Sequence, residues 1–103
     1  MKMKRLEAAL KGVLNSAKVA NKEKRIEHAL NTATDNFEDQ KITAEENIDS
    51  CIKELADTSN IQDMITNISE YIGEKEAAEA GIKRIEKIKK YLDEEVDVEE
   101  KKD

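Results

Sequence analysis

The chain has 103 residues, enough for one domain, and its formal net charge is −6 at pH 7. Charged residues make up 41% and aromatic residues 3%, with no proline or tryptophan, a composition typical of long helices. No apolar run approaches the roughly 20 residues of a membrane span, and none follows Met1 as a secretion signal would. We therefore expect a cytoplasmic or virion-associated protein with no secretion signal and no membrane span.

The first predicted element is a short amphipathic helix over about residues 3–20. Apolar residues recur in it at steps of three and four: Leu6, Leu10, Val13, Ala17 and Ala20. Continuing this spacing would place the charged Lys24 on the stripe, but the next apolar position is Ile26, so the apolar side of the helix shifts there. Asn21 stands at this shift and is a competent N-cap, so we place a hinge there. A continuous bent helix is the alternative.

Residues 22–57 are predicted to form the first arm of a long helical hairpin. Its apolar seam contains Ile26, Leu30, Phe37, Ile48, Ile52 and Leu55. The middle of this arm is poor in helix formers, and Thr43 with Glu46 spells a capping box. We predict one helix, and a break between Asp35 and Thr43 is the alternative.

Residues 60–94 are predicted to form the second arm. Its seam contains Ile65, Ile68, Ile72, Ile82, Ile85 and Leu92. The hinge is the polar run 57–60, in which Ser59 or Asn60 can cap the next helix while Gln62 or Asp63 reaches back. So short a connector makes the arms antiparallel neighbours. This register places Phe37 opposite Ala80, within a run of small residues at 77–81.

These patterns predict an all-α fold, a long antiparallel helical hairpin resembling a coiled coil, with a short N-terminal amphipathic helix. One helical domain is expected over residues 1–96 and an acidic flexible tail over residues 97–103. Tyr91 and Glu95 have the Tyr-x-x-x-Glu spacing of small helical-hairpin substrates of type VII secretion, which the chain also resembles in size. The Trp-x-Gly at the hinge of those proteins is missing, so no function is carried over from this resemblance.

Charge is segregated along the chain. The net charge is +6 over residues 1–25, −11 over 26–79, +4 over 80–92 and −5 over 93–103. A hairpin brings basic residues of both arms to its open end. From these, and from the apolar stripe of the first helix, we predict interaction residues: Leu6, Leu10, Val13, Lys22, Arg25, Lys83, Arg84 and Lys87.

The apolar stripe of the first helix needs a surface to cover it, because the two arms already face each other. Folding back would place Lys4 and Arg5 beside an already basic end, which like charges disfavour. Packing of the first helix against the acidic segment 26–79 of a neighbouring copy avoids this repulsion. We therefore expect a homo-oligomer.

No catalytic, metal or cofactor site is predicted, and we expect no enzymatic activity. His28 is the only histidine and is predicted to lie on the surface. Cys51 is the only cysteine, and its place beside the seam indicates a buried apolar residue. The carboxylate clusters lack the second histidine or cysteine pair of a metal site, and Gly12, Gly73 and Gly81 are isolated within helices.

The sequence thus predicts a non-enzymatic helical protein–protein interaction or assembly component, such as an oligomeric scaffold or an accessory protein of a phage virion. The alternative is an acidic regulatory binder or inhibitor, of DNA-mimic or anti-defence type, that occupies a partner's basic or hydrophobic site. Nucleic acid is not expected as a partner, since no aromatic platform or binding motif accompanies the lysines.

Overall fold

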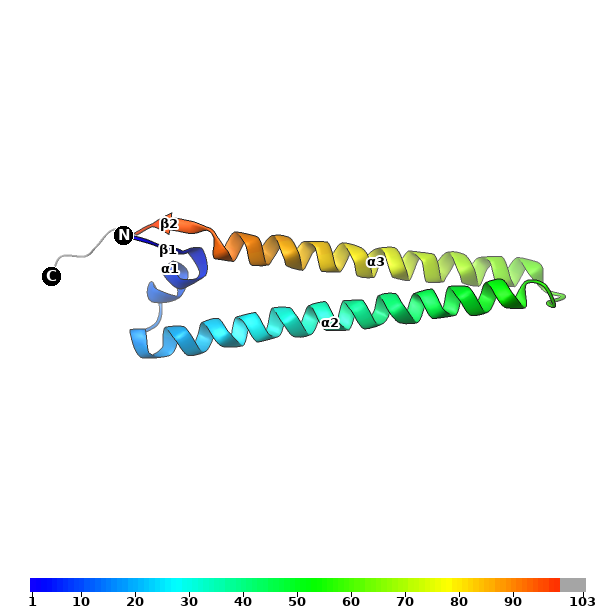
Figure 1. The fold of residues 1–103 in the computed structure, drawn as a ribbon, viewed down its shortest axis with the longest axis horizontal. Coiled ribbons are helices and arrows are strands. Elements are labelled where there is room, and N and C mark those ends of the chain that lie inside the picture. The colour runs from blue at the N-terminus through cyan, green and yellow to red at the C-terminus, as the bar shows by residue number, and fades with distance from the viewer. Residues whose placement is uncertain (99–103) are drawn as a thin grey trace. The chain divides into compact units, whose positions relative to one another are not determined.

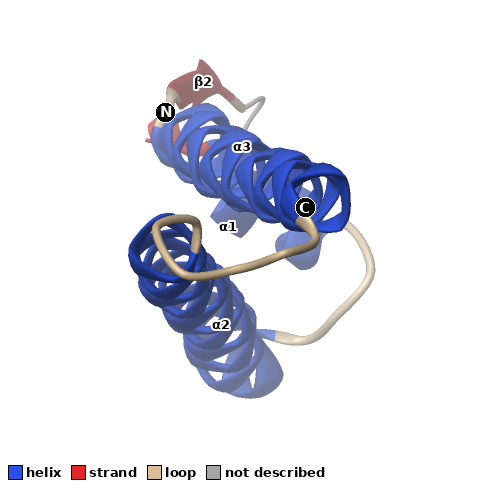
Figure 2. Ribbon diagram, turned by 90° about the vertical axis from the view of Figure 1, so that its right-hand side faces the viewer, coloured by secondary structure: helices blue, strands red, loops and turns tan. Residues whose placement is uncertain are grey.

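The computed structural model describes residues 1–98. Its elements are β1 (Lys2–Lys4), α1 (Arg5–Lys11), α2 (Ser16–Glu54), α3 (Ile61–Asp93) and β2 (Glu95–Asp97) (Figure 1). The chain forms two compact units. Unit 1 contains Met1–Thr32 and residues 85–98, and unit 2 is Ala33–Arg84. In each unit a segment of α2 lies beside an antiparallel segment of α3 (Figures 1 and 2), which confirms the all-α helical hairpin with a short N-terminal helix.

The second helix begins at Ser16, so the prediction of a hinge at Asn21 is wrong. Asn15 caps it, because the Lys18 N–H donates to the Asn15 side-chain Oδ1 at 3.2 Å and to its carbonyl oxygen at 3.0 Å. The seam already includes Val19, which is 4% exposed. The first helix is correspondingly shorter than predicted and ends at Lys11.

α2 is continuous through its middle, where a break was the alternative. Thr43 and Glu46 are exposed residues inside the helix and cap nothing. Phe37 and Ala44 keep the buried side facing α3 across this region, and Ala44 is 1% exposed. Packing therefore outweighs the weak helix propensity of residues 31–36.

Polar side chains close the connection between α2 and α3, as predicted. The Thr58 N–H donates to the Glu54 carbonyl at 3.0 Å, and the Asn60 N–H donates to Thr58 Oγ1 at 3.1 Å. Asn60 caps α3: the Asp63 N–H donates to Asn60 Oδ1 at 3.4 Å, and Asn60 Nδ2 donates to Asp63 Oδ2 at 2.6 Å. This reciprocal pair fixes the start of α3 at Ile61.

Phe37 and Gly81 fix the register of the two helices in unit 2. A Cβ added to Gly81 would stand 2.7 Å from Phe37 Cζ, so the ring lies directly on the glycine. Ala78, one turn earlier on α3, is 1% exposed. The predicted packing of Phe37 on the small-residue run is confirmed, with Gly81 rather than Ala80 beneath the ring.

A short antiparallel ribbon joins the two ends of the described chain. It was not predicted from the sequence. Lys2 pairs with Asp97, Met3 with Val96, and Lys4 with Glu95. Met3 is 7% exposed, and the Val98 N–H donates to the Met1 carbonyl at 2.8 Å. Of the predicted acidic tail, Asp97 therefore belongs to β2, and residues 99–103 lie outside the described part.

Candidate interaction surfaces

The seam of unit 2 follows a heptad pattern on both helices. On α3, residues that are buried or half-buried recur at steps of four and three: Met64, Ile68, Tyr71, Lys75, Ala78 and Ile82. On α2 the corresponding residues are Phe37, Lys41, Ala44, Ile48, Cys51 and Leu55. This is the spacing at which side chains of one helix face a partner helix. In unit 1 the predicted core residues Ile26, Leu30, Ile85 and Leu92 are likewise buried or half-buried.

Three residues predicted for the core lie outside it. The exposed fraction is 54% for Ile52, 47% for Ile65 and 42% for Ile72. Each directly follows a seam residue, about 100° further round its helix. The seam of α3 passes instead through the less aliphatic Met64 and Tyr71, because these keep an uninterrupted heptad phase with the rest of the helix.

The exposed isoleucines of unit 2 form two stripes. They are Ile42 and Ile52 on α2 and Ile61, Ile65 and Ile72 on α3, and each is between 42% and 56% exposed. At about 100° per residue, the three on α3 lie within about 40° of one another and the two on α2 within about 80°. We call these five residues the isoleucine face.

Lys75 shows that the two stripes border the same side of the seam. Its Nζ lies 3.9 Å from Glu45 Oε1 on α2 and 3.8 Å from Glu79 Oε1 on α3. Glu45 stands one heptad before Ile52, and Glu79 one heptad after Ile72, so each carboxylate belongs to one stripe. Because one ammonium group reaches both carboxylates, the stripes lie on one face of unit 2.

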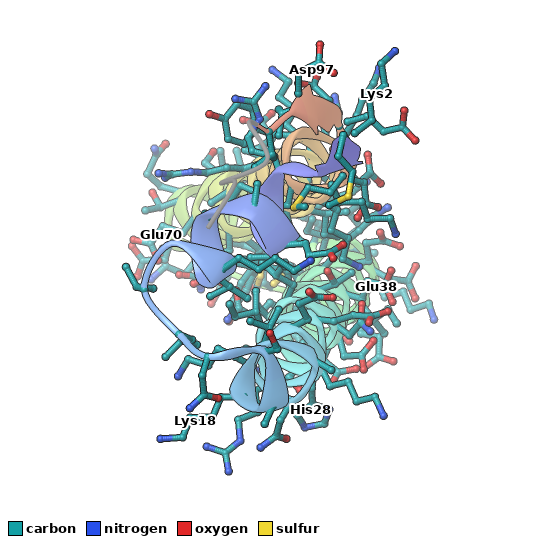
Figure 3. The ribbon with its side chains drawn as sticks, turned by 90° about the vertical axis from the view of Figure 1, so that its left-hand side faces the viewer. Lys2, Lys18, His28, Glu38, Glu70 and Asp97 are labelled. Atoms are coloured by element: carbon teal, nitrogen blue, oxygen red, sulfur yellow. The ribbon has the colours of Figure 1, made fainter. Side chains whose placement is uncertain are left out.

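The opposite side of unit 2 is polar. A hollow on that side is lined by Asp39, Gln40, Thr43, Glu74 and Ala77. In Figure 3, Glu38, which belongs to the α2 stripe, and Glu70 on α3 point to opposite sides. On α3, the exposed isoleucines lie about 140–180° round the helix from Glu74, which lines the hollow. The two faces of unit 2 therefore differ in chemistry.

Carboxylates are interspersed with the isoleucines. Unit 2 contains thirteen acidic and five basic residues, a net charge of −8. Glu38 and Glu76 continue the two stripes, and neither has an ion pair within residues 1–98. Asp49, between Ile42 and Ile52, pairs with Lys53 at 2.9 Å. The isoleucine face is thus bordered by carboxylates, of which Glu38 and Glu76 have no ion pair within residues 1–98.

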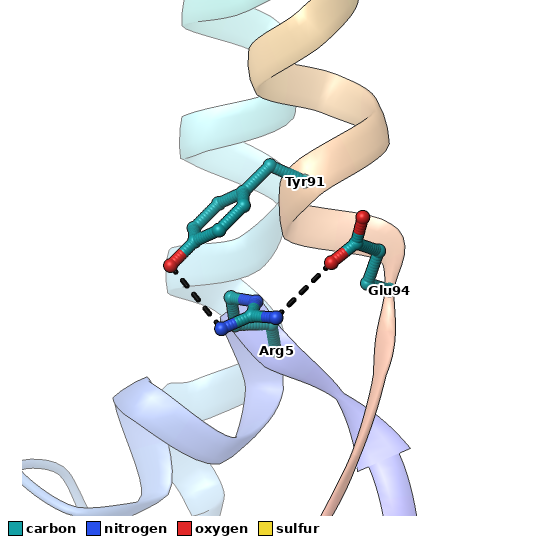
Figure 4. Close-up of polar contacts among 3 residues, drawn as sticks. All are labelled: Arg5, Tyr91 and Glu94. Carbon is teal, nitrogen blue, oxygen red and sulfur yellow. Dashed lines mark hydrogen bonds and ion pairs between the residues drawn. The ribbon is translucent and has the colours of Figure 1, made fainter.

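In unit 1, Arg5 joins the start of α1 to the end of α3 (Figure 4). Its guanidinium carbon lies 4.1 Å from the centroid of the Tyr91 ring, a cation–π distance. Nη1 donates to the Tyr91 hydroxyl at 3.2 Å, and Nη2 donates to Glu94 Oε2 at 3.0 Å. The Arg5 backbone N–H also donates to the Glu94 carbonyl at 2.7 Å. One side chain therefore holds the start of α1 against the end of α3.

The N-terminal segment folds back onto unit 1, the arrangement that the like-charge argument disfavoured. Three of its cations pair with acidic residues, and two of these acids follow Leu92. The ion pairs are Lys4–Asp93 at 3.8 Å, Arg5–Glu94 at 3.0 Å and Lys11–Glu7 at 3.0 Å. The predicted repulsion left out the acidic residues that follow Leu92. Self-association stays a prediction, but these ion pairs reduce the like-charge repulsion that favoured it.

A cavity of about 210 Å³ lies in unit 1 between α1, α2 and α3. Its apolar lining is Leu6, Ile26, Leu30 and Leu92, and its charged lining is Lys4, Glu7, Glu23, Glu27, Lys89 and Asp93. Lys89 Nζ donates to Asn31 Oδ1 at 2.6 Å across the same region. Leu6 therefore forms part of a wall within unit 1.

The predicted interaction residues divide between exposed and half-buried positions. Leu6 and Leu10 are half-buried, whereas Val13 is 78% exposed on the connection between α1 and α2. The basic members are exposed, and no ion pair is found for them in the part of the chain that is described: Lys22, Arg25, Lys83, Arg84 and Lys87. The isoleucine face was missed, because its members had been assigned to the core or left unassigned.

No cluster of metal-binding side chains is found within residues 1–98. In that range no three His, Cys, Asp or Glu side chains are arranged to hold a metal ion, and no helix is both long and apolar enough to cross a membrane. His28 points outward from α2 (Figure 3), and Cys51 is a buried thiol in the seam.

Comparison with protein-family models, with curated proteins and with solved structures finds no match for this chain.

Proposed function

We propose that the protein is a non-enzymatic helical interaction or assembly component that binds another protein through the isoleucine face. The observation that carries this proposal is the gathering of five exposed isoleucines on one side of unit 2. Exposed apolar side chains that gather on one side of a protein mark interaction sites, whereas scattered ones do not. The opposite, polar face of the same two helices provides an internal comparison.

The net charge of −8 on unit 2 favours a second form of this function. In this form the protein is an acidic regulatory binder that occupies a basic or hydrophobic site on its partner. The same charge repels nucleic acid phosphates, which supports a protein partner. A cytoplasmic or virion-associated setting and assembly with further copies are part of the proposal and stay predictions.

Site-specific photocrosslinking in the native host tests the proposal. A photoreactive amino acid at Ser69, which borders Ile65 and Ile72, should crosslink to a protein partner. The same amino acid at Asn67, on the other side of α3, is the matched control. Both positions are exposed, so neither substitution disturbs the seam. Equal crosslinking from both positions, or none from Ser69, would reject the isoleucine face as the binding surface.

A further inference from the structure

We propose that the isoleucine face binds a cationic amphipathic helix of a partner protein. This inference rests on the proposed function and specifies the chemistry of the partner. The helix would present an aliphatic ridge to the isoleucines and lysine or arginine side chains to the carboxylates between them.

The spacing of the isoleucines favours a helix as the occupant. Both stripes follow helices that are packed side by side, and their members recur at helical steps. A third helix laid along them contacts both stripes with residues at i, i+3, i+4 and i+7, as in helix-in-groove recognition. Ile52 and Ile65, near the connection between α2 and α3, provide one end of this track, and Ile42 and Ile72 continue it.

The charges specify the flanks of that helix. Glu38 and Glu76 continue the two stripes without an ion pair in the described chain, and both are exposed. Glu45 and Glu79 already share Lys75. A partner with cations beside its apolar ridge would gain complementary charge along the same track. The long stems of lysine and arginine would also cover the edges of the isoleucines.

A second copy of the chain fits this face less well. A symmetric pair uses the same patch on both molecules, so it would place one unit 2 of charge −8 against another. The isoleucines would be covered, but the carboxylates that border them would approach an equally acidic surface of the other copy. Like charges across an interface act against the complex.

The inference is tested with two synthetic peptides of about 21 residues, or three heptads. Both peptides carry leucine at steps of four and three. Their other positions include the same number of charged residues, which are lysine in one peptide and glutamate in the other. Fluorescence anisotropy measures their binding to the full chain. The lysine peptide should bind at least about tenfold more tightly than the glutamate peptide. Its affinity should fall as salt is raised, because part of the attraction is screened.

Two pairs of variants locate the binding site. The triple variant Ile52→Gln, Ile65→Gln, Ile72→Gln removes apolar surface and should weaken binding of the lysine peptide by about tenfold or more. Glu38→Gln with Glu76→Gln removes two carboxylates that border the isoleucine face. Glu70→Gln with Glu74→Gln removes two from the opposite side and is its charge-matched control. Only the first of these two charge variants should weaken binding by more than about threefold.

Circular dichroism checks that each variant keeps its helix content, and the two charge variants decide the question if the triple variant does not fold. Binding that is unchanged in the triple variant, or equally weakened by both charge variants, overturns the inference. So does self-association of the full chain that the triple variant abolishes. That last outcome leaves the proposed function standing, since the isoleucine face would then bind a second copy.

Discussion

The ring of Phe37 lies on Gly81, and an added Cβ there would stand 2.7–2.8 Å from three ring atoms. We therefore expect Gly81→Ala to destabilise the protein by about 1–2 kcal/mol in urea denaturation, because crowding outweighs the gain in helix propensity. Gly73 is the matched control, since a Cβ there meets nothing within 4 Å. Gly73→Ala should raise stability by up to about 1 kcal/mol. A gain at both glycines would contradict the contact.

Removing the ring should reverse the effect at Gly81. Phe37→Ala is expected to cost about 2–4 kcal/mol, because the ring is half-buried and leaves a cavity. In the Phe37→Ala background, Gly81→Ala should become neutral or stabilising. The double-mutant cycle, measured by urea denaturation, should show a coupling of at least about 1 kcal/mol. Strict additivity would show that the two residues do not touch.

The cap at Asn15 distinguishes the observed start of α2 from the predicted one. Asn15→Ala should lower stability by about 1 kcal/mol, because the Lys18 N–H loses its side-chain acceptor. Asn21→Ala should be neutral or slightly stabilising, because alanine is the better residue inside a helix. Thermal melting of the two variants measures the difference. The opposite order would place the helix start at Asn21.

Arg5 is expected to hold the ribbon and α1 in place. Arg5→Lys keeps the charge but loses the stacked, two-sided guanidinium contact with Tyr91 and Glu94. Amide exchange of the Arg5 N–H, which donates to the Glu94 carbonyl, should accelerate by about fivefold. Lys18→Ala serves as the control, because the Lys18 side chain is exposed and points outward from the start of α2 (Figure 3). Equal acceleration in both variants would remove this role from Arg5.

The hairpin and its connection could be predicted because local chemistry and packing agree there. Asn60 and Asp63 make a reciprocal cap, and Phe37 needs small residues opposite it. The phase of the α3 seam could not be read in the same way, because apolarity alone favours Ile65 and Ile72 as core residues. The helices instead select the phase that continues through the small residues of α3, and the displaced isoleucines become exposed.

The ribbon was missed although its sequence carries a signal. Apolar and charged residues alternate over residues 1–4 and again over residues 95–98, the period-two pattern of a strand. The charged positions are lysines in the first run and acids in the second, which favours their pairing. Three-residue strands are too short for this pattern to stand out in a helical chain.

Cys51 gives the seam of unit 2 a built-in reporter. It is the only cysteine of the chain, it is 8% exposed, and it lies in the seam between Ile48 and Leu55. A thiol reagent can reach it only when that part of α2 separates from α3, so the rate of modification measures how often the two helices part. An occupant that tightens the isoleucine face should slow this reaction, and one bound elsewhere should leave it unchanged. The modification rate of this one thiol thus measures transient separation of α2 from α3 in unit 2.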